Sequence, residues 1–316
     1  LHEPYRRQRQ MCIRDSRTTV GGVHLVNGVP VAESVFGQDP FEPVRHSAVA
    51  ELIAEQSGVP VHLSPALGAG DPVPGGEGIL VFDGQTPEDL SSTARRLLED
   101  GGLHIMAGCA GFGAVLPALL GLASDSPKEA PQLSERLLVV CGSVNPISVA
   151  QMAAAEAAGV TRWQMTPEQK LQPDYWRTEK GQAEFAAIRE GVARNNPYII
   201  DTNDKERNRL TDEYAASHGI DIDGIRLGVS QSIGYLVGNL FTDPSVGTLL
   251  ITGGDTLLQC MEQMGVREVE PVRELTTGVV LSRVSYQGCT HCVLTKSGGF
   301  GKETLVTDLA RQLARC

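Results

Sequence analysis

The sequence predicts an α/β protein with two domains, each built on a mostly parallel sheet flanked by helices. Three observations support this fold class. Short apolar runs of strand length alternate with longer amphipathic segments, as in parallel sheets with helical crossovers. Several of these runs end in a polar turn that opens a helix. A polar, proline-bearing stretch at 126–135 separates two such series, and 316 residues are enough for two cores.

The first half contains a glycine-rich segment and a clear strand-helix unit. Asn27-Gly28 lies between apolar pairs and is a typical hairpin turn. Thr86, followed by Pro87 and by an acid at position 89, is a typical helix start. The threonine hydroxyl can accept a hydrogen bond from the backbone amide of residue 89, and the acid can accept one from the amide of Thr86. The predicted elements are a hairpin around 27–28, a helix at 47–56, a strand at 78–82, a helix from 87, and a strand and helix within 104–123.

The second half repeats the pattern. Its apolar runs are short and each is followed by a turn, which is typical of strands buried on both faces of a parallel sheet. A second capped helix start is expected at Thr166. The predicted elements are strands at 137–141, 198–201, 248–252, 279–284 and 292–295, and helices at 147–159, 179–195, 225–241, 257–265 and the C-terminal end.

Composition limits the classes of function. The net charge of −11 disfavours binding to nucleic acid or to an anionic membrane surface. No apolar run approaches the roughly 18 residues of a membrane span. The seven cysteines are scattered, which fits reduced thiols and a cytoplasmic protein. Cys289 and Cys292 have the spacing of a zinc ligand pair, but no second pair accompanies them, so no protein metal site is predicted.

Residues 1–16 differ from the rest of the chain. They hold four arginines and lack the glycine- and valine-rich texture that begins at Arg17. The stretch resembles translated sequencing-adapter reads; a disordered basic tail is the alternative. We therefore leave it out of the fold, assign 17–125 to an N-terminal domain and 126–135 to a linker, and assign 136–316 to a C-terminal domain.

The GGDT turn at Gly253–Thr256 follows an apolar strand. Gly253 and Gly254 let the backbone approach a phosphate, and the next helix offers its N-terminal amides. Asp255 could hold Mg²⁺ or accept a proton from a substrate hydroxyl, and Thr256 completes the turn. The alternative is an ordinary tight turn with Asp255 as a helix cap.

A second glycine turn, KSGGFG, follows the strand at 292–295. Lys296 could neutralise charge on a transferring phosphoryl group, and Ser297, Gly298 and Gly299 could surround the phosphates. The alternative is a solvated lysine beside an irregular loop. The spacing matches neither a Walker A motif nor a dinucleotide fingerprint.

A third turn, GSVNP, follows the strand at 137–141. Ser143 could contact the phosphates or the sugar of a nucleotide. It is equally compatible with a turn in which Ser143 or Asn145 caps the following helix.

Several phrases of the chain occur, in this order, in a known family. RTTVGGVHLVNGVPVAESVFGQDPFEPVRHS, ILVFDGQTPEDL, GSVNPISVAQ, TGGDTL and TKSGGFG resemble the four-carbon acid sugar kinases, from Arg17 to the C-terminus. The resemblance implies ATP-dependent phosphorylation of the terminal hydroxyl of a threonate-, erythronate- or oxo-tetronate-type acid. It also implies a sugar-binding N-terminal domain, and a C-terminal domain in which Ser143, the Gly253–Thr256 turn and Gly298 lie at the ATP.

The chain departs from the family at its start. Family members begin with an Asp-Asp…Thr-Gly strand and a later Asp-Ser-Thr…Arg-Gly motif, which line the acid-sugar site, and neither is present here. We therefore expect a truncated gene and an incomplete substrate pocket. The partners expected are the acid sugar and ATP, with a homodimer left open.

Two functional hypotheses follow. The first is an acid sugar kinase in which Lys296 offsets developing charge and Asp255 orients Mg²⁺ or the nucleophile. The second is a nucleotide- or acid-sugar-binding regulatory protein without catalysis, which would suit the missing motifs. A dehydrogenase is disfavoured, because no dinucleotide fingerprint follows the strands.

Overall fold

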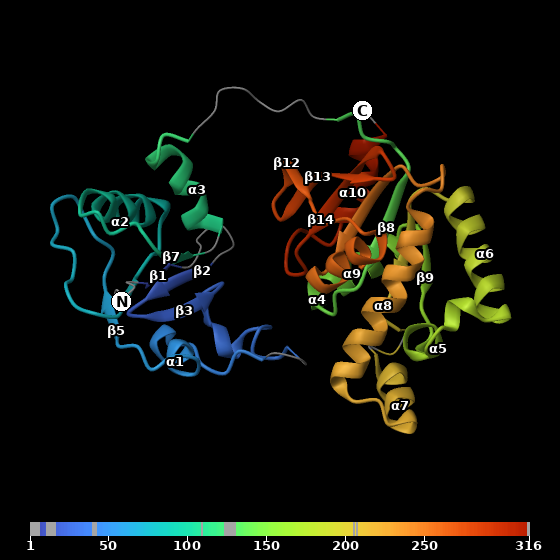
Figure 1. Ribbon diagram of the computed structural model, residues 1–316, viewed down its shortest axis with the longest axis horizontal. Coiled ribbons are helices and arrows are strands. Elements are labelled where there is room, and N and C mark those ends of the chain that lie inside the picture. Colours follow the sequence, from blue (N-terminus) through green and yellow to red (C-terminus); the bar gives the residue numbers. More distant parts are fainter. Residues whose placement is uncertain are drawn as a thin grey trace. The chain divides into compact units, whose positions relative to one another are not determined.

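The structure is a computed structural model that describes residues 7–10, 17–39, 43–108, 110–122, 131–204, 206 and 208–314. Contacts within the chain divide it into two compact units, Leu1–Pro127 and Lys128–Cys316 (Figure 1). The predicted linker at 126–135 lies partly outside the described residues. Each unit has its own sheets and cores, as predicted for a two-domain α/β chain.

The first unit contains a four-stranded parallel sheet in the order β5-β6-β1-β7 and a small antiparallel sheet β2-β3-β4. The predicted hairpin is confirmed: Asn27 and Gly28 both have positive φ, the conformation of a tight hairpin turn. The predicted caps of Thr86 and the acid three residues later are confirmed as well. The strands are β1 (Arg7–Gln10), β2 (Arg17–Val20), β3 (Val23–Val26), β4 (Val29–Pro30), β5 (Val61–Ser64), β6 (Ile79–Phe82) and β7 (Met106–Gly108), and the helices are α1 (Val49–Ala54), α2 (Pro87–Glu99) and α3 (Ala110–Leu119).

Residues 7–10 differ from the expectation that the first sixteen residues stay outside the fold. They form β1, which pairs in parallel with β6 on one side and β7 on the other. The backbone explains this, because a strand between two parallel neighbours needs only its own amide and carbonyl groups to complete both ladders. The other residues of 1–16 lie outside the described part of the chain.

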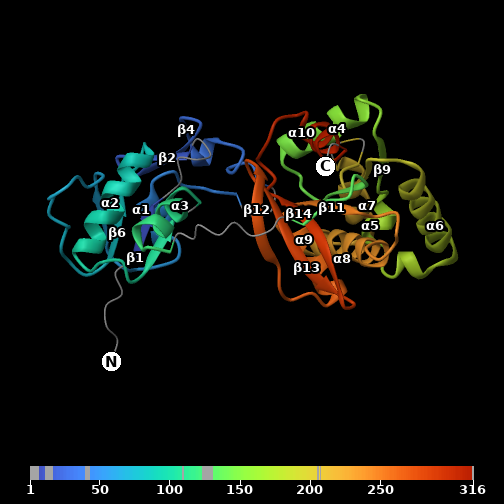
Figure 2. The same cartoon turned by 90° about the horizontal axis from the view of Figure 1, so that it is seen from above.

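The second unit contains a seven-stranded sheet in the order β12-β13-β14-β11-β8-β10-β9. Its five strands from β14 to β9 are parallel, while β12 and β13 are antiparallel at one edge (Figure 2). The strands are β8 (Leu137–Cys141), β9 (Thr161–Gln164), β10 (Tyr198–Asp201), β11 (Thr248–Thr252), β12 (Glu270–Thr276), β13 (Val279–Tyr286) and β14 (Cys289–Lys296).

Helices cover both faces of this sheet. Successive residues of a strand point to opposite faces, so Leu137 and Val139 pack with α4 and α10, while Leu138 and Val140 pack with α6, α8 and α9. The helices are α4 (Pro146–Ala157), α5 (Pro167–Leu171), α6 (Glu179–Arg194), α7 (Arg209–His218), α8 (Ile222–Leu240), α9 (Gly254–Met264) and α10 (Leu305–Leu313). The capping box predicted at Thr166 begins α5. A doubly covered, mostly parallel sheet places its ligand-binding edge at the carboxyl ends of its strands.

The structure also contains elements that were not predicted from the sequence, among them β5, β9, α7 and β12. It also starts α9 at Gly254, three residues earlier than predicted, so most of the GGDT turn is the first turn of a helix.

Candidate functional site

The candidate site lies at the carboxyl edge of the large sheet, where four neighbouring parallel strands end at the same level. Thr252, the last residue of β11, pairs with Lys296 of β14 and with Cys141 of β8. Cys141 pairs in turn with Asp201, the last residue of β10. This register brings the three predicted turns, GSVNP at 142–146, GGDT at 253–256 and KSGGFG at 296–301, to one edge, although they are far apart in the sequence.

The GSVNP and GGDT turns are in direct contact. A Cβ atom added to Gly142 would lie 1.8 Å from Oγ1 of Thr256, and one added to Gly253 would lie 3.4 Å from the Ser143 amide nitrogen. Gly253 has φ of 108°, a conformation that favours glycine. Glycine at position 142 therefore lets the end of β8 lie against the Thr256 side chain, and glycine at position 253 provides the backbone conformation of the turn.

The KSGGFG loop closes on the GSVNP turn from the other side. A Cβ atom on Gly298 would lie 2.5 Å from Oγ of Ser143 and 3.2 Å from Cβ of Asn145. Two side chains of α4 hold the loop: Ser148 donates to the Gly298 carbonyl at 2.7 Å, and Gln151 donates to the carbonyls of Phe300 and Lys302. The three turns thus meet around Ser143.

Backbone amides on this surface are available to a ligand. Gly253 is the N-cap of α9 and supplies no side chain, so the amides of the first helical turn are not capped from within the described residues. The α9 helix has eleven residues and presents the positive end of its dipole here. By contrast, Asn145 caps α4 by accepting from Ile147, which uses one of the open amides of that helix.

Lys296 lies beneath the loop. Its side chain is 3 % exposed, and Nζ donates to the carbonyls of Ser297 and Gly298, both at 3.0 Å, and to Oγ of Ser148 at 3.2 Å. Burial lowers the pKa of this ammonium to about 8. We expected Lys296 to face the phosphates; in the structure the loop folds back over the end of β14 and presents its carbonyls to the ammonium.

Asp255 lies on the open side of the first turn of α9. Its carboxylate is exposed and forms an ion pair with Arg226 of α8, with Nε 2.8 Å from Oδ2. Among the described residues no group of three or more His, Cys, Asp or Glu side chains is arranged to hold a metal ion. A carboxylate beside open amides nevertheless fits the usual way in which Mg²⁺ is held, by one or two carboxylates and the substrate phosphates.

A buried polar network at the end of β10 was missed by the sequence analysis. Asp201 accepts from the amide and side chain of Asn203 and pairs with Arg162 at 2.7 Å. Asn203 donates to the Ser143 carbonyl at 3.1 Å, while Lys170 is buried and donates to the carbonyl of residue 202. The sequence nevertheless indicates a polar turn here, because the polar run DTND follows an apolar strand, as the three glycine turns do.

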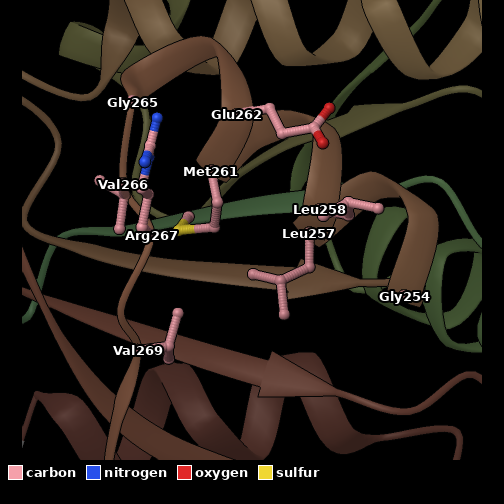
Figure 3. Close-up of a pocket in the computed structure, with 9 residues that line it drawn as sticks. All are labelled: Gly254, Leu257, Leu258, Met261, Glu262, Gly265, Val266, Arg267 and Val269. Carbon is pink, nitrogen blue, oxygen red and sulfur yellow. The ribbon is translucent and has the colours of Figure 1, made fainter.

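An apolar pocket of about 630 Å³ begins at Gly254 and runs along α9 (Figure 3). Its walls are aliphatic, with one acid and one arginine among them. The lining residues come from α9 and from the segment that follows it: Gly254, Leu257, Leu258, Met261, Glu262, Gly265, Val266, Arg267 and Val269. The pocket and the open amides therefore share the first turn of α9.

Comparison with known proteins agrees with this layout. The model of a nucleotide-binding C-terminal domain matches residues 138–306, and the model of a sugar-binding N-terminal domain matches residues 12–116. The chain belongs to the four-carbon acid sugar kinase family. Within the family, the three turns and the apolar pocket fall in the nucleotide-binding domain.

Relatives in the family are named for their substrates. The chain is 27 % identical over 311 residues to a D-threonate kinase of Salmonella typhimurium, covering 92 % of this chain and 70 % of that protein. It is 31 % identical over 155 residues to a D-erythronate kinase of Heliobacterium modesticaldum, covering 45 % of this chain and 34 % of that protein. A crystal structure of a Haemophilus influenzae protein shares the fold, with a TM-score of 0.59, 17 % identity, and coverage of 98 % of this chain and 74 % of that one.

No helix in the described ranges has the length and apolarity that a membrane span needs.

Proposed function

We propose that this protein is a kinase that transfers the γ-phosphoryl group of ATP to the terminal hydroxyl of a four-carbon acid sugar of the threonate or erythronate type. The names of the relatives support the reaction and the substrate class. In this proposal the N-terminal unit binds the sugar and the C-terminal unit binds the nucleotide, in line with the two family domains.

The observation that carries the proposal is the common level at which β8, β11 and β14 end. It brings three glycine-containing turns into contact around Ser143. Backbone amides at a helix start and in a glycine loop bind phosphate oxygens without placing side chains in the way. Positioned amides also suit phosphoryl transfer, which needs orientation and charge stabilisation more than covalent chemistry.

Mg²⁺ would be held by Asp255 together with the phosphates. The ion would offset charge on the phosphoryl group that is transferred. Asp255 is suited to this because it is exposed, lies on the first turn of α9, and has Arg226 beside it to fix its orientation.

The nucleoside would occupy the apolar pocket along α9. A helix rises about 1.5 Å per residue, so the eleven residues of α9 from Gly254 to Met264 span about 16 Å. Aliphatic side chains such as Leu257 and Met261 can pack against the faces of a purine ring, and the open amides at the same helix start can reach its phosphates.

A coupled assay of ADP release tests the proposal. Purified protein with ATP and Mg²⁺ is given D-threonate, D-erythronate or, as a control, an acid sugar of six carbons. We expect ADP release that depends on a four-carbon acid and stops when Mg²⁺ is chelated. ATP binding without turnover on any four-carbon acid would instead support the regulatory protein, and absence of ATP binding would refute a nucleotide site.

A further inference from the structure

We infer that Lys296 is a positioning residue, which shapes the phosphate-binding loop from beneath and does not itself contact the phosphates. The inference rests on the nucleotide site proposed above. It concerns the buried ammonium, the two carbonyls that it binds, and the two glycine amides that follow those carbonyls.

The Lys296 ammonium makes all its hydrogen bonds within the protein. Nζ of Lys296 has three protons, and three acceptors lie within hydrogen-bond distance: the carbonyls of Ser297 and Gly298 and Oγ of Ser148. The ammonium is therefore saturated by the protein. A buried lysine with all its donors in use has none left for a phosphate oxygen.

The amides of Gly298 and Gly299 point away from the buried ammonium. In a planar trans peptide the carbonyl of one residue and the amide N–H of the next point in opposite directions. Because the carbonyls of Ser297 and Gly298 turn inward to Lys296, the N–H groups of Gly298 and Gly299 turn away from it. Neither of these two amides donates to an acceptor in the described ranges of the chain. Two successive outward amides form a concave site for an anion.

The Gly298 carbonyl accepts two hydrogen bonds, one from Lys296 and one from Ser148. Oγ of Ser148 donates to the Gly298 carbonyl at 2.7 Å and accepts from Lys296 at 3.2 Å. Ser148 is fully buried on α4 and cannot contact a ligand directly. Lys296, Ser148 and the loop carbonyls are thus joined by hydrogen bonds. These bonds hold Gly298 and Gly299 in place, although glycines have the greatest conformational freedom.

The experiment compares Lys296→Met with a matched control, Lys180→Met. Methionine fills the buried space without a charge, and Lys180 is an exposed lysine of α6 in the same unit, so both variants lose one positive charge. Calorimetry with ATP·Mg²⁺ and with ADP should show both nucleotides binding about 10- to 100-fold more weakly to Lys296→Met, since two charge-assisted hydrogen bonds to the loop are lost. Lys180→Met should bind as the wild type does.

Kinetics separate positioning from direct contact. A positioning role raises the KM for ATP more than it lowers kcat, because the loop can still be ordered at saturating nucleotide. A variant that binds both nucleotides normally but loses kcat would overturn the inference in favour of direct transition-state contact. Unchanged binding together with unchanged kcat would overturn it as well.

A readout without nucleotide keeps this inference separate from the proposed function. Amide resonances of ¹⁵N-labelled glycine in the free protein report the loop directly, and those of Gly298 and Gly299 should shift or broaden in Lys296→Met but not in Lys180→Met. If the wild type binds no nucleotide, the kinase proposal fails while these resonances still decide the role of Lys296. If Lys296→Met does not fold, Ser148→Ala replaces it: the same two resonances should move, and unchanged resonances would overturn the inference.

Discussion

Gly142 and Thr256 are in such close contact that a single methyl group on Gly142 would lie 1.8 Å from Oγ1 of the threonine. Rotating the hydroxyl away would not help, because Cβ and Cγ2 of Thr256 would be only 2.9 and 3.1 Å from the added atom. This contact joins the end of β8 to the first turn of α9. It sets the distance between two of the three turns of the proposed phosphate site.

Replacing Gly142 by alanine should therefore push α9 away from β8. We expect a loss of about 1–3 kcal/mol in the free energy of unfolding, the usual cost of forcing one extra group into a packed site. Urea unfolding measures it. Gly238→Ala is the matched control, because its Cβ would meet side chains of α9 at 3.6 and 3.7 Å, which is ordinary contact. Equal stability of the two variants would contradict the account of this contact.

Asp255 should matter to turnover far more than to stability. Its ion pair with Arg226 is exposed, and such pairs contribute about 0.2–1 kcal/mol. We expect Asp255→Asn to lower kcat about 100-fold or more, because a Mg²⁺ ligand is lost. Arg226→Ala breaks the same pair but keeps the carboxylate and should stay within about tenfold of wild type. If both variants lose the same activity, the ion pair and not the metal explains the role of Asp255.

The pocket along α9 can be tested at an exposed leucine. Leu258 lines the pocket and is 54 % exposed, while Leu227 of α8 is 53 % exposed and outside it. Aspartate at position 258 would place a charge against the proposed purine and near its phosphates, so ATP should bind about tenfold more weakly or worse. Leu227→Asp should leave the Kd for ATP unchanged. Equal binding by both variants would place the nucleoside elsewhere.

The loop should respond to pH through Lys296. Burial lowers the pKa of its ammonium from 10.5 to about 8, and burial holds the pKa of the neighbouring Cys141 thiol well above its ordinary value, so the lysine titrates first. Below pH 8 both the folded and the unfolded chain carry the charge, and burying it costs stability. As the pH rises from about 8 to 10.5 only the unfolded chain stays protonated, so this cost is relieved.

Nucleotide affinity should change in the opposite direction, because the uncharged amine binds the loop carbonyls more weakly. We expect the affinity of the wild type for ADP to fall as the pH passes through about 8. Lys296→Met should show no such step over the same range in parallel calorimetric titrations. A step of equal size in the variant would assign the titration to another group.

Much of the fold was predictable from the sequence because local signals decide it. The hairpin at Asn27-Gly28, the capping boxes at Thr86 and Thr166, and the strand at 248–252 depend on residues within a few positions of one another. The short strand β9 was missed because its pairing with β10, a strand far along the chain, and not its local pattern, makes it a strand. The edge strand β12 pairs with the next strand, β13, and was missed because its mostly exposed residues give no apolar run.

The site was predictable to the level of its turns but not of its side chains. Strand ends followed by glycine turns indicate a ligand-binding edge, and the register confirms that the three turns meet. The direction of the Lys296 side chain was not predictable, because it depends on carbonyls of a loop that folds back over its own strand. Asn203 was missed because its contact with Ser143 joins residues 60 positions apart.

The three turns are proposed to bind one nucleotide together. Because each turn carries glycine amides, an ATP·Mg²⁺ titration of ¹⁵N-glycine-labelled protein can follow all three turns at once. We expect the resonances of the five site glycines to shift along one binding curve, while that of Gly219 at the end of α7 stays in place; the five are Gly142, Gly253, Gly254, Gly298 and Gly299. Shifts confined to one turn, or ATP binding that leaves all five resonances in place, would contradict it.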